Sequence, residues 1–209
     1  MAEPYGPVGS PRYREYLDCI HTSGAHLLSL INDILDIARF DAGQAELEEA
    51  TIDMTSKISD IVRMMSGQAA KARVALVVDM PPDLPLLTGD RRRMRQILLN
   101  LISNALKFTR PGGTVTIRAR VDHGFNIEVR DTGIGMAPQD YAKALEPFGQ
   151  VDCSLARKYE GTGLGLPLTR QLTELHGGVL SLDSKVDVGT TVTVSLPQWR
   201  IVGCEEKAA

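Results

Sequence analysis

Residues 100–109 read NLISNALKFT, and the spacing of the polar side chains in this stretch decides how the fold is interpreted. A helix is predicted from a capping aspartate, Asp90, to about Phe108. Polar side chains recur along it at steps of three, four and seven residues, so they share one face, while apolar side chains supply the buried face. The polar residues are Asn100, Ser103, Asn104 and Lys107, and the apolar ones are Ile97, Leu98, Leu101, Ile102 and Ala105.

The polar face of this helix has two interpretations. An amide oxygen can coordinate a hard cation and a lysine supplies positive charge to phosphate, which suits a magnesium-bound triphosphate. A row of polar side chains beside a buried stripe is also typical of an ordinary solvated helix face. This stretch alone does not choose between the two interpretations.

A second motif, DTGIGM at residues 131–136, places an acid at the end of a predicted strand and glycines directly after it. Glycine has no Cβ and lets the backbone approach a flat ligand closely. The ionised carboxylate of Asp131 accepts hydrogen bonds, which suits an exocyclic amine such as that of adenine. Because a strand followed by a glycine turn is common in proteins, this motif is weak by itself.

A third group of motifs surrounds a polar loop at residues 150–160. EPF at residues 146–148 precedes the loop, Arg157 and Lys158 lie within it, and GTGLGL at residues 161–166 follows it. Glycines that open a helix expose backbone N–H groups and the positive end of the helix dipole to anions. The length and composition of the loop predict a mobile lid with the glycines as hinges. A threonine of GTT, residues 189–191, can face a base from the last strand.

The other elements follow from hydrophobic periodicity and from turn residues. Residues 11–40 predict one long amphipathic helix, and a domain boundary is placed near Gly43, before an acidic connector. Further helices are predicted at 53–71, 139–145 and 164–176, and strands at 74–80, 114–121, 125–131, 179–184 and 190–196. Long helices interleaved with paired strands predict a two-layer α/β sandwich, with helices on a mixed, largely antiparallel sheet.

Composition excludes several classes of protein. The 209 residues are 43% hydrophobic and 23% charged with a net charge of −3, which gives no reason for wholesale attraction to nucleic acid or to an anionic membrane. No stretch approaches the ~20 apolar residues that cross a bilayer, and the N-terminus lacks a signal-peptide layout, so a cytoplasmic segment is expected. The three cysteines form no paired motif, which argues against disulfides and zinc.

The ordered set of motifs resembles the sensor histidine kinases. NLISNALKFT is similar to their asparagine box, DTGIGM to the first glycine box, EPFGQ to the phenylalanine box, GTGLGLPL to the second glycine box and GTTVTV to the final one. The resemblance covers residues 10–196, and the stretch at 5–43 looks like the loop and second hairpin helix of alphaproteobacterial cell-cycle kinases. It implies the Bergerat-type α/β sandwich shared with gyrase-type and Hsp90-type ATPases, preceded by one long amphipathic helix.

The resemblance also implies a set of site residues that bind ATP and Mg²⁺. Asn104 would hold magnesium with help from Asn100, Lys107 would contact phosphate, and Asp131 would bind the adenine amine. The other nucleotide-binding positions that the motifs imply are Gly133, Gly135, Met136 and Thr190 around the base, Phe148, Arg157 and Lys158 beside or within the lid, and Gly161, Thr162, Gly163, Leu164 and Gly165 at the phosphates.

One position separates this chain from the hydrolytic branches of that superfamily. The gyrase and Hsp90 branches place a glutamate one helical turn before the magnesium asparagine, where it orients the attacking water. Asn100 stands at that position here. Because an amide is a poor general base, the sequence favours holding ATP for transfer to a partner group over rapid hydrolysis.

The phosphoacceptor histidine of such a kinase is not recognised in this sequence. None of its histidines, which are His21, His26, His123 and His176, is followed by the acid and the arginine-threonine-proline sequence of an acceptor box. We therefore expect a truncated hairpin at 1–43, an ATP-binding domain at 44–200 and a tail at 201–209. The expected activity is γ-phosphoryl transfer to a histidine outside this chain, and the alternative is a nucleotide-binding scaffold without productive transfer.

The same resemblance sets the expected partners. They are the histidine-bearing hairpin of a sensor kinase, a response regulator and a weakly associated second copy that pairs through the helix at 11–40. Neither nucleic acid nor a membrane contact by this segment is expected, and a membrane anchor in the parent kinase is left open.

Overall fold

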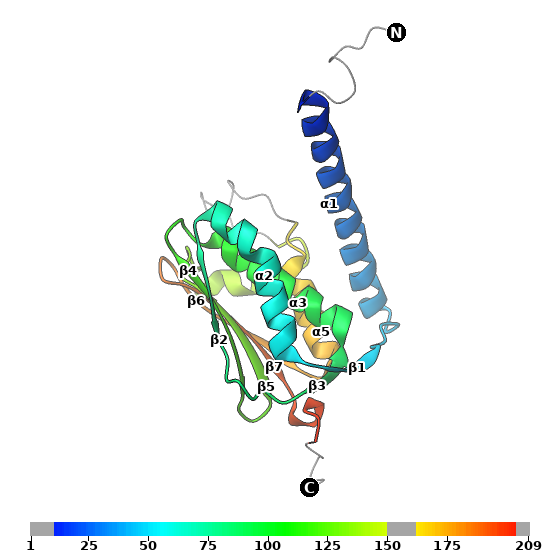
Figure 1. The fold of residues 1–209 in the computed structure, drawn as a ribbon. Helices are drawn as coiled ribbons and strands as arrows, with labels where there is room; N and C mark the ends of the chain where they lie inside the picture. The colour runs from blue at the N-terminus through cyan, green and yellow to red at the C-terminus, as the bar shows by residue number, and fades with distance from the viewer. Residues whose placement is uncertain (1–10, 150–161, 204–209) are drawn as a thin grey trace. The chain divides into compact units, whose positions relative to one another are not determined.

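The computed structural model describes residues 11–149 and 162–203, and the chain divides into two compact units, Met1–Gly43 and Gln44–Ala209. The described part of the first unit is a single long helix, α1 (Pro11–Asp41), as its periodicity predicts (Figure 1). Large apolar side chains recur along α1 and are exposed. They are Leu17, Ile20, Leu27, Leu28, Ile31, Ile34 and Leu35.

The second unit is built on a five-stranded sheet in the order β2-β4-β5-β7-β6. The strands are β2 (Ala75–Asp79), β4 (Thr114–Val121), β5 (Phe125–Asp131), β6 (Val179–Lys185) and β7 (Gly189–Leu196). β2 pairs with β4 in parallel, and every other pair in this sheet is antiparallel. The predicted mixed, largely antiparallel sheet is therefore confirmed.

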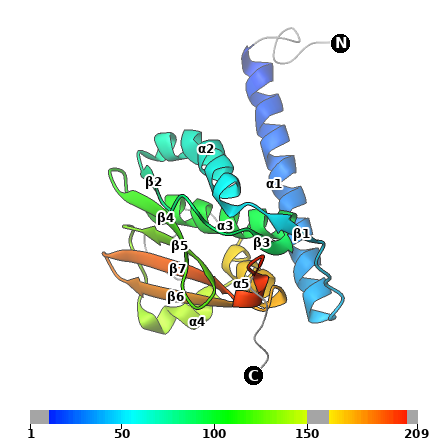
Figure 2. The ribbon, with the colours of Figure 1, turned by 60° about the horizontal axis from the view of Figure 1, so that its bottom comes forward.

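Helices cover one face of this sheet and leave the other face open (Figure 1). The covering helices are α2 (Met54–Ala72), α3 (Arg91–Phe108) and α5 (Gly165–Leu175), while the short 3-10 turn η1 (Pro138–Asp140) and α4 (Tyr141–Ala144) lie beside β6 (Figure 2). Side chains of β4 and β5 alternate between the two faces, so Ile117 and Ile127 are buried beneath α3. The predicted two-layer α/β sandwich is confirmed.

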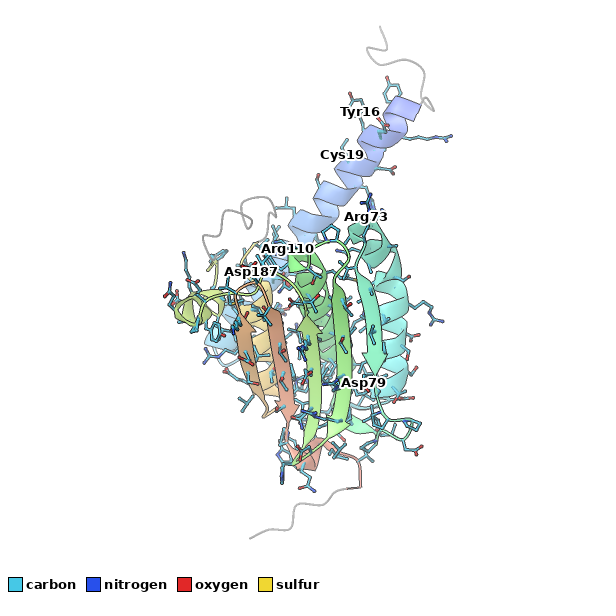
Figure 3. The ribbon with its side chains drawn as sticks, turned by 90° about the vertical axis from the view of Figure 1, so that its left-hand side faces the viewer. Tyr16, Cys19, Arg73, Asp79, Arg110 and Asp187 are labelled. Carbon is cyan, nitrogen blue, oxygen red and sulfur yellow. The ribbon has the colours of Figure 1, made fainter. Side chains whose placement is uncertain are left out.

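The open face of the sheet is polar and carries cross-strand ion pairs. Arg118 on β4 contacts Asp79 on β2 at 2.7 Å and Glu128 on β5 at 3.2 Å. Figure 3 shows this face, with Asp79 labelled on its strand. Polar cross-strand pairs suit a surface that faces water, so the hydrophobic core lies on the helix side only.

A second, two-stranded sheet was not predicted from the sequence. β1 (Glu49–Ile52) pairs antiparallel with β3 (Leu87–Asp90). β1 lies in the stretch that was interpreted as an acidic connector, and β3 lies between the strand predicted at 74–80 and the helix predicted from Asp90, where no element was predicted. The pairing brings the buried side chains of Ile52 and Leu87 together. Leu87 also bridges to Ile201, which follows the 3-10 turn η3 (Gln198–Arg200), so ordered structure continues past residue 200.

Buried polar groups join the elements at the β1–β3 end of the second unit. Asp90 caps α3 by accepting hydrogen bonds from Arg92 N and Arg93 N, and its own N–H donates to His176 Nε2 at 3.1 Å. His176 Nδ1 lies 2.7 Å from Leu172 O in α5, which assigns the proton to Nδ1 and leaves Nε2 as the acceptor. The neutral ring therefore ties the end of α5 to the start of α3.

The His176 link predicts a specific loss of stability. In His176→Asn the amide can still reach Leu172 O but not Asp90 N, so one buried N–H loses its acceptor, at a cost of about 1–3 kcal/mol. The melting temperature should fall by about 2–4 °C for each kcal/mol lost. His123→Asn is the control, because the His123 side chain is fully exposed in a hairpin turn and asparagine tolerates its positive φ.

A pH series on the same variants separates this link from simple loss of packing. Burial lowers the pKa of His176, and the nearby charge of Arg200 adds to the shift, against the Leu172 carbonyl and the carboxylates of Asp90 and Glu49. Folded protein thus binds this proton at lower pH than unfolded protein, so stability falls as the pH drops below about 6.5. His176→Asn should show a flatter pH dependence than wild type, and equal slopes would contradict the assignment.

Candidate functional site

The carboxylate of Asp131, at the end of β5, is held by the backbone of two neighbouring segments. Its Oδ1 accepts hydrogen bonds from Gly133 N at 2.8 Å and from Thr190 N at 3.2 Å. Burial raises the pKa of this carboxyl, although both N–H groups favour its charged form. Both of these hydrogen bonds reach Oδ1, so the orientation of the carboxylate is fixed and Oδ2 takes no part in them.

The glycines around Asp131 allow backbone segments to pack directly against each other. A Cβ on Gly133 would lie 2.3 Å from Phe108 O, one on Gly135 would lie 2.0 Å from Lys185 O, and one on Gly189 would lie 2.0 Å from Asp131 O. Gly135 and Gly189 also have φ values of +61° and +130°. These glycines are therefore required by packing within the chain, and their predicted approach to a flat ligand stays a prediction.

The polar face of α3 lies against the start of α5. Asn100 Nδ2 donates to Gly165 O at 3.3 Å, and a Cβ on Gly165 would lie 3.4 Å from Asn104 Nδ2. The asparagine motif and the second glycine motif, far apart in the sequence, thus meet through these residues. Neither asparagine is buried, and both belong to the helix whose opposite side forms the core.

Lys107 lies on the last turn of α3 and is partly buried. Burial lowers the pKa of its ammonium group, and Nζ lies 4.9 Å from the centroid of the Phe108 ring. A partly desolvated ammonium close to an aromatic ring is an effective site of positive charge for an anion, because fewer water molecules screen it.

The described residues on either side of 150–161 are tied together. Phe148 N donates to Gly163 O at 3.2 Å, and the hydroxyl of Thr162 accepts from Leu164 N at 3.3 Å. Gly163 has a φ of +71°, and a Cβ there would lie 2.8 Å from the carbonyl carbon of Phe148. Leu164 is buried and Phe148 is exposed. The predicted residues Arg157, Lys158 and Gly161 lie outside the described residues.

An exposed ion pair lies close to the DTGIGM segment that begins at Asp131. Arg110, just after α3, contacts Asp187 in the β6–β7 turn at 2.8 Å, and both residues are labelled in Figure 3. Asp187 N also donates to Ile134 O at 2.7 Å, which holds the same turn against the DTGIGM segment. Because both charges are exposed, the backbone hydrogen bond and not the ion pair fixes this approach.

Two residues of this region were missed in the sequence. Ser184 lies opposite Thr190 in the β6–β7 register, and its Oγ lies 2.8 Å from Thr190 Oγ1 and accepts from Met136 N at 2.9 Å. The hydroxyl of Tyr141 in α4 accepts from Ser184 N at 2.7 Å. Only the hairpin register could have indicated Ser184, and nothing local in the sequence indicates Tyr141.

Other kinds of site find little support in the described residues. No group of three or more histidine, cysteine, aspartate or glutamate side chains there could hold a metal ion. Within residues 11–149 and 162–203, no helix combines the length and the apolar character that crossing a membrane requires. At the end of β5 the carboxylate of Asp131 meets backbone N–H groups, while the amides of α3 lie against the start of α5.

Comparison with known proteins identifies the family. Residues 89–200 match the family described as histidine kinase-, DNA gyrase B-, and HSP90-like ATPase, and the chain belongs to this family. The likeness to a sensor histidine kinase that the sequence motifs predicted is confirmed.

Curated relatives are longer than this chain. It is 43% identical over 94% of its residues to the non-motile and phage-resistance protein of Caulobacter vibrioides, of which it covers 24%. It is 41% identical over 95% of its residues to the circadian input-output histidine kinase CikA of Synechococcus elongatus, and 37% identical over 96% to the cell-division control histidine kinase PdhS of Brucella suis. It covers 26% and 20% of these two proteins.

Solved structures share the fold. The crystal structure of full-length ShkA in complex with AMPPNP matches with a TM-score of 0.77 and 34% identity, over 90% of this chain and 39% of ShkA. The histidine kinase AdeS of Acinetobacter baumannii matches with a TM-score of 0.70 over 86% of this chain and 83% of AdeS, and at 20% identity it supports the fold alone.

The close backbone packing predicts opposite effects for two glycine substitutions. Gly135→Ala should destabilise the second unit by about 1–3 kcal/mol, because the new Cβ overlaps Lys185 O and φ is positive. Gly67→Ala in α2 is the matched control, since nothing lies within 4 Å of its Cβ position and alanine favours the helix by up to about 1 kcal/mol. Urea unfolding measures both, and a Gly135→Ala protein as stable as wild type would refute this packing.

Proposed function

We propose that this chain binds Mg-ATP at the end of β5 and passes the γ-phosphoryl group to a histidine on a separate hairpin of a sensor kinase. The observation that carries the proposal is the fixed carboxylate of Asp131, which opens a glycine turn tied to the end of α3 by the hydrogen bond from Ile134 N to Phe108 O. Membership of the ATPase family, the likeness to the histidine kinases CikA and PdhS, and the likeness to ShkA, which was solved in complex with AMPPNP, support it. A response regulator would then receive the phosphoryl group from the histidine.

For the base, we propose that Asp131 accepts a hydrogen bond from the adenine amine. Oδ1 is already satisfied by two backbone N–H groups, which leaves Oδ2 for the ligand. Gly133, Gly135, Met136 and Thr190 would form the wall of the same pocket. A charge-assisted hydrogen bond to a preoriented carboxylate is among the stronger polar contacts a protein can offer.

For the phosphates, we propose the start of α5 and Lys107. The first N–H groups of a helix have no intrahelical partner and carry the positive end of its dipole. Thr162, Gly163, Leu164 and Gly165 lead into this helix, and the proposal extends to Gly161, Arg157, Lys158 and Phe148 around the loop at 150–161. The partly buried ammonium of Lys107 would add positive charge.

The residues present also fit a magnesium ion. Mg²⁺ keeps several waters and takes substrate phosphate oxygens, so one amide oxygen such as that of Asn104 is a sufficient protein contribution. When bound, the ion would neutralise charge on the phosphates during transfer. Asn104 is partly exposed beside the backbone of Gly165, so its amide is available for a ligand without disturbing the core.

The contact made by Asn100 supports transfer to a partner over hydrolysis. Its amide nitrogen donates to Gly165 O and so holds α3 against α5. A neutral amide used in this way cannot take a proton from water, whereas the corresponding position of a hydrolytic enzyme needs a base. In phosphoryl transfer the protein acts mainly by positioning and by electrostatic stabilisation, which the residues above can supply.

For α1, we propose the role of the second helix of a dimerisation hairpin. Its exposed leucine and isoleucine side chains form a stripe that would gain free energy from packing into a helical bundle. We propose that two copies associate weakly through this stripe. We also propose the domain division expected from the sequence, with the hairpin helix at 1–43 and the ATP-binding domain at 44–200.

A substitution at Asp131 tests the base site. Asp131→Asn should weaken ATP binding by roughly 10- to 100-fold, because the amide loses the negative charge and its NH₂ group can face the adenine amine. Asp79→Asn is the matched control, since Asp79 lies on the open face of the sheet in an ion pair with Arg118. Calorimetry measures both affinities, and an unchanged affinity in Asp131→Asn would exclude the adenine assignment.

A transfer experiment tests the activity. With radiolabelled ATP, Mg²⁺ and an added acceptor hairpin of a sensor kinase, wild type should label the hairpin and Asn104→Ala should lose at least about tenfold in rate. Asn126→Ala, at the opposite end of β5, should keep the activity. A wild type that binds ATP but leaves the hairpin unlabelled would instead identify a nucleotide-binding scaffold.

A further inference from the structure

A single buried hydroxyl connects the segments that surround the proposed base site. Ser184 Oγ lies 2.8 Å from Thr190 Oγ1 and 3.1 Å from Gly189 O, and it accepts a hydrogen bond from Met136 N at 2.9 Å. Ser184 therefore links β6, the start of β7 and the glycine turn that follows Asp131. The Thr190 N–H in turn donates to Asp131 Oδ1, so the hydrogen bonds continue from Ser184 through Thr190 to the carboxylate.

Counting protons gives the direction of each hydrogen bond. A serine hydroxyl has one proton and two lone pairs. Gly189 O can only accept, so it requires the proton of Ser184, and the Met136 N–H occupies one lone pair. All three contacts are hydrogen bonds only if Thr190 donates its own proton to the remaining lone pair of Ser184. The Thr190 oxygen is then left with lone pairs alone.

We propose that Ser184 is a positioning residue that makes the Thr190 hydroxyl an acceptor and so selects 6-aminopurine over 6-oxopurine nucleotides. The proposal rests on ATP binding at Asp131. Asp131 Oδ2 and Thr190 Oγ1 then form a pair of acceptors, which matches an exocyclic amine with two hydrogens. A 6-oxo group would instead meet lone pairs, and sites built from fixed hydrogen-bonding groups reject a mismatched ligand strongly.

Tyr141 holds Ser184 in this position from outside the sheet. Its hydroxyl accepts from Ser184 N at 2.7 Å and donates to Ser184 O, so it pairs both backbone groups of one residue in an edge strand. The phenol thus takes the place that a further strand would occupy at this point. Tyr141 is a second positioning residue, and it acts through Ser184.

The ratio of two binding constants tests the proposal. ATP and inosine triphosphate differ at the 6-position and at N1 of the purine, so calorimetry with each gives the preference for the amine. Ser184→Ala should lower this preference by about tenfold, because the Thr190 proton is released and can be donated to the 6-oxo group. A purely structural serine would weaken both nucleotides equally and leave the ratio unchanged, which would overturn the proposal.

Two further variants keep the test decisive if Ser184→Ala folds poorly. Thr190→Val removes the acceptor itself and should lower the preference as much, and adding Ser184→Ala to it should change the ratio no further. Tyr141→Phe should lower the preference by a smaller factor. Unchanged ratios in all of these variants would overturn the proposal while ATP binding stands, whereas a wild type that binds no ATP would overturn both.

Discussion

The second unit is organised at one end by the carboxylate of Asp131 and the backbone groups that hold it. Two N–H groups from different segments, Gly133 and Thr190, converge on one oxygen of a buried acid. This contact joins the end of β5 to the glycine turn and to β7, and a buried carboxylate without such donors would be costly. The glycines around Asp131 follow from this contact, because the backbone segments that meet there approach more closely than a Cβ atom would permit.

The opposite end of the same unit is held by different chemistry. Asp90, His176 and Arg200 connect the start of α3, the end of α5 and η3 through buried hydrogen bonds, and Arg200 Nε donates to His176 O at 3.0 Å. Although burial would raise the pKa of Asp90, the N–H groups of Arg93, Glu48 and Arg92 outweigh it and lower that pKa. With α3 and α5 fixed at this end, Asn100 and Gly165 meet at the other.

Local signals predicted much of this architecture. Asp90 was predicted to cap α3 because an aspartate directly before an apolar periodic run favours a helix start. In the structure Asp90 and Asp53, the first residue of the helix predicted at 53–71, both accept hydrogen bonds from backbone N–H groups of the helix that follows. β1 and β3 were missed because each is short and its pairing joins residues distant in sequence. Ser184 was missed for a related reason, since its hydroxyl acquires partners only through strand register and the packing of the glycine turn.

Above all, we propose that the purine of ATP binds at Asp131 and that its phosphates bind at the start of α5. A crystal structure of the chain with Mg²⁺ and a non-hydrolysable ATP analogue tests this claim most directly. It should place the exocyclic amine within hydrogen-bonding distance of Asp131 Oδ2, with the phosphates between Lys107 and Gly165 and the metal at Asn104. A nucleotide bound elsewhere, or a base whose amine faces away from Asp131, would contradict the account.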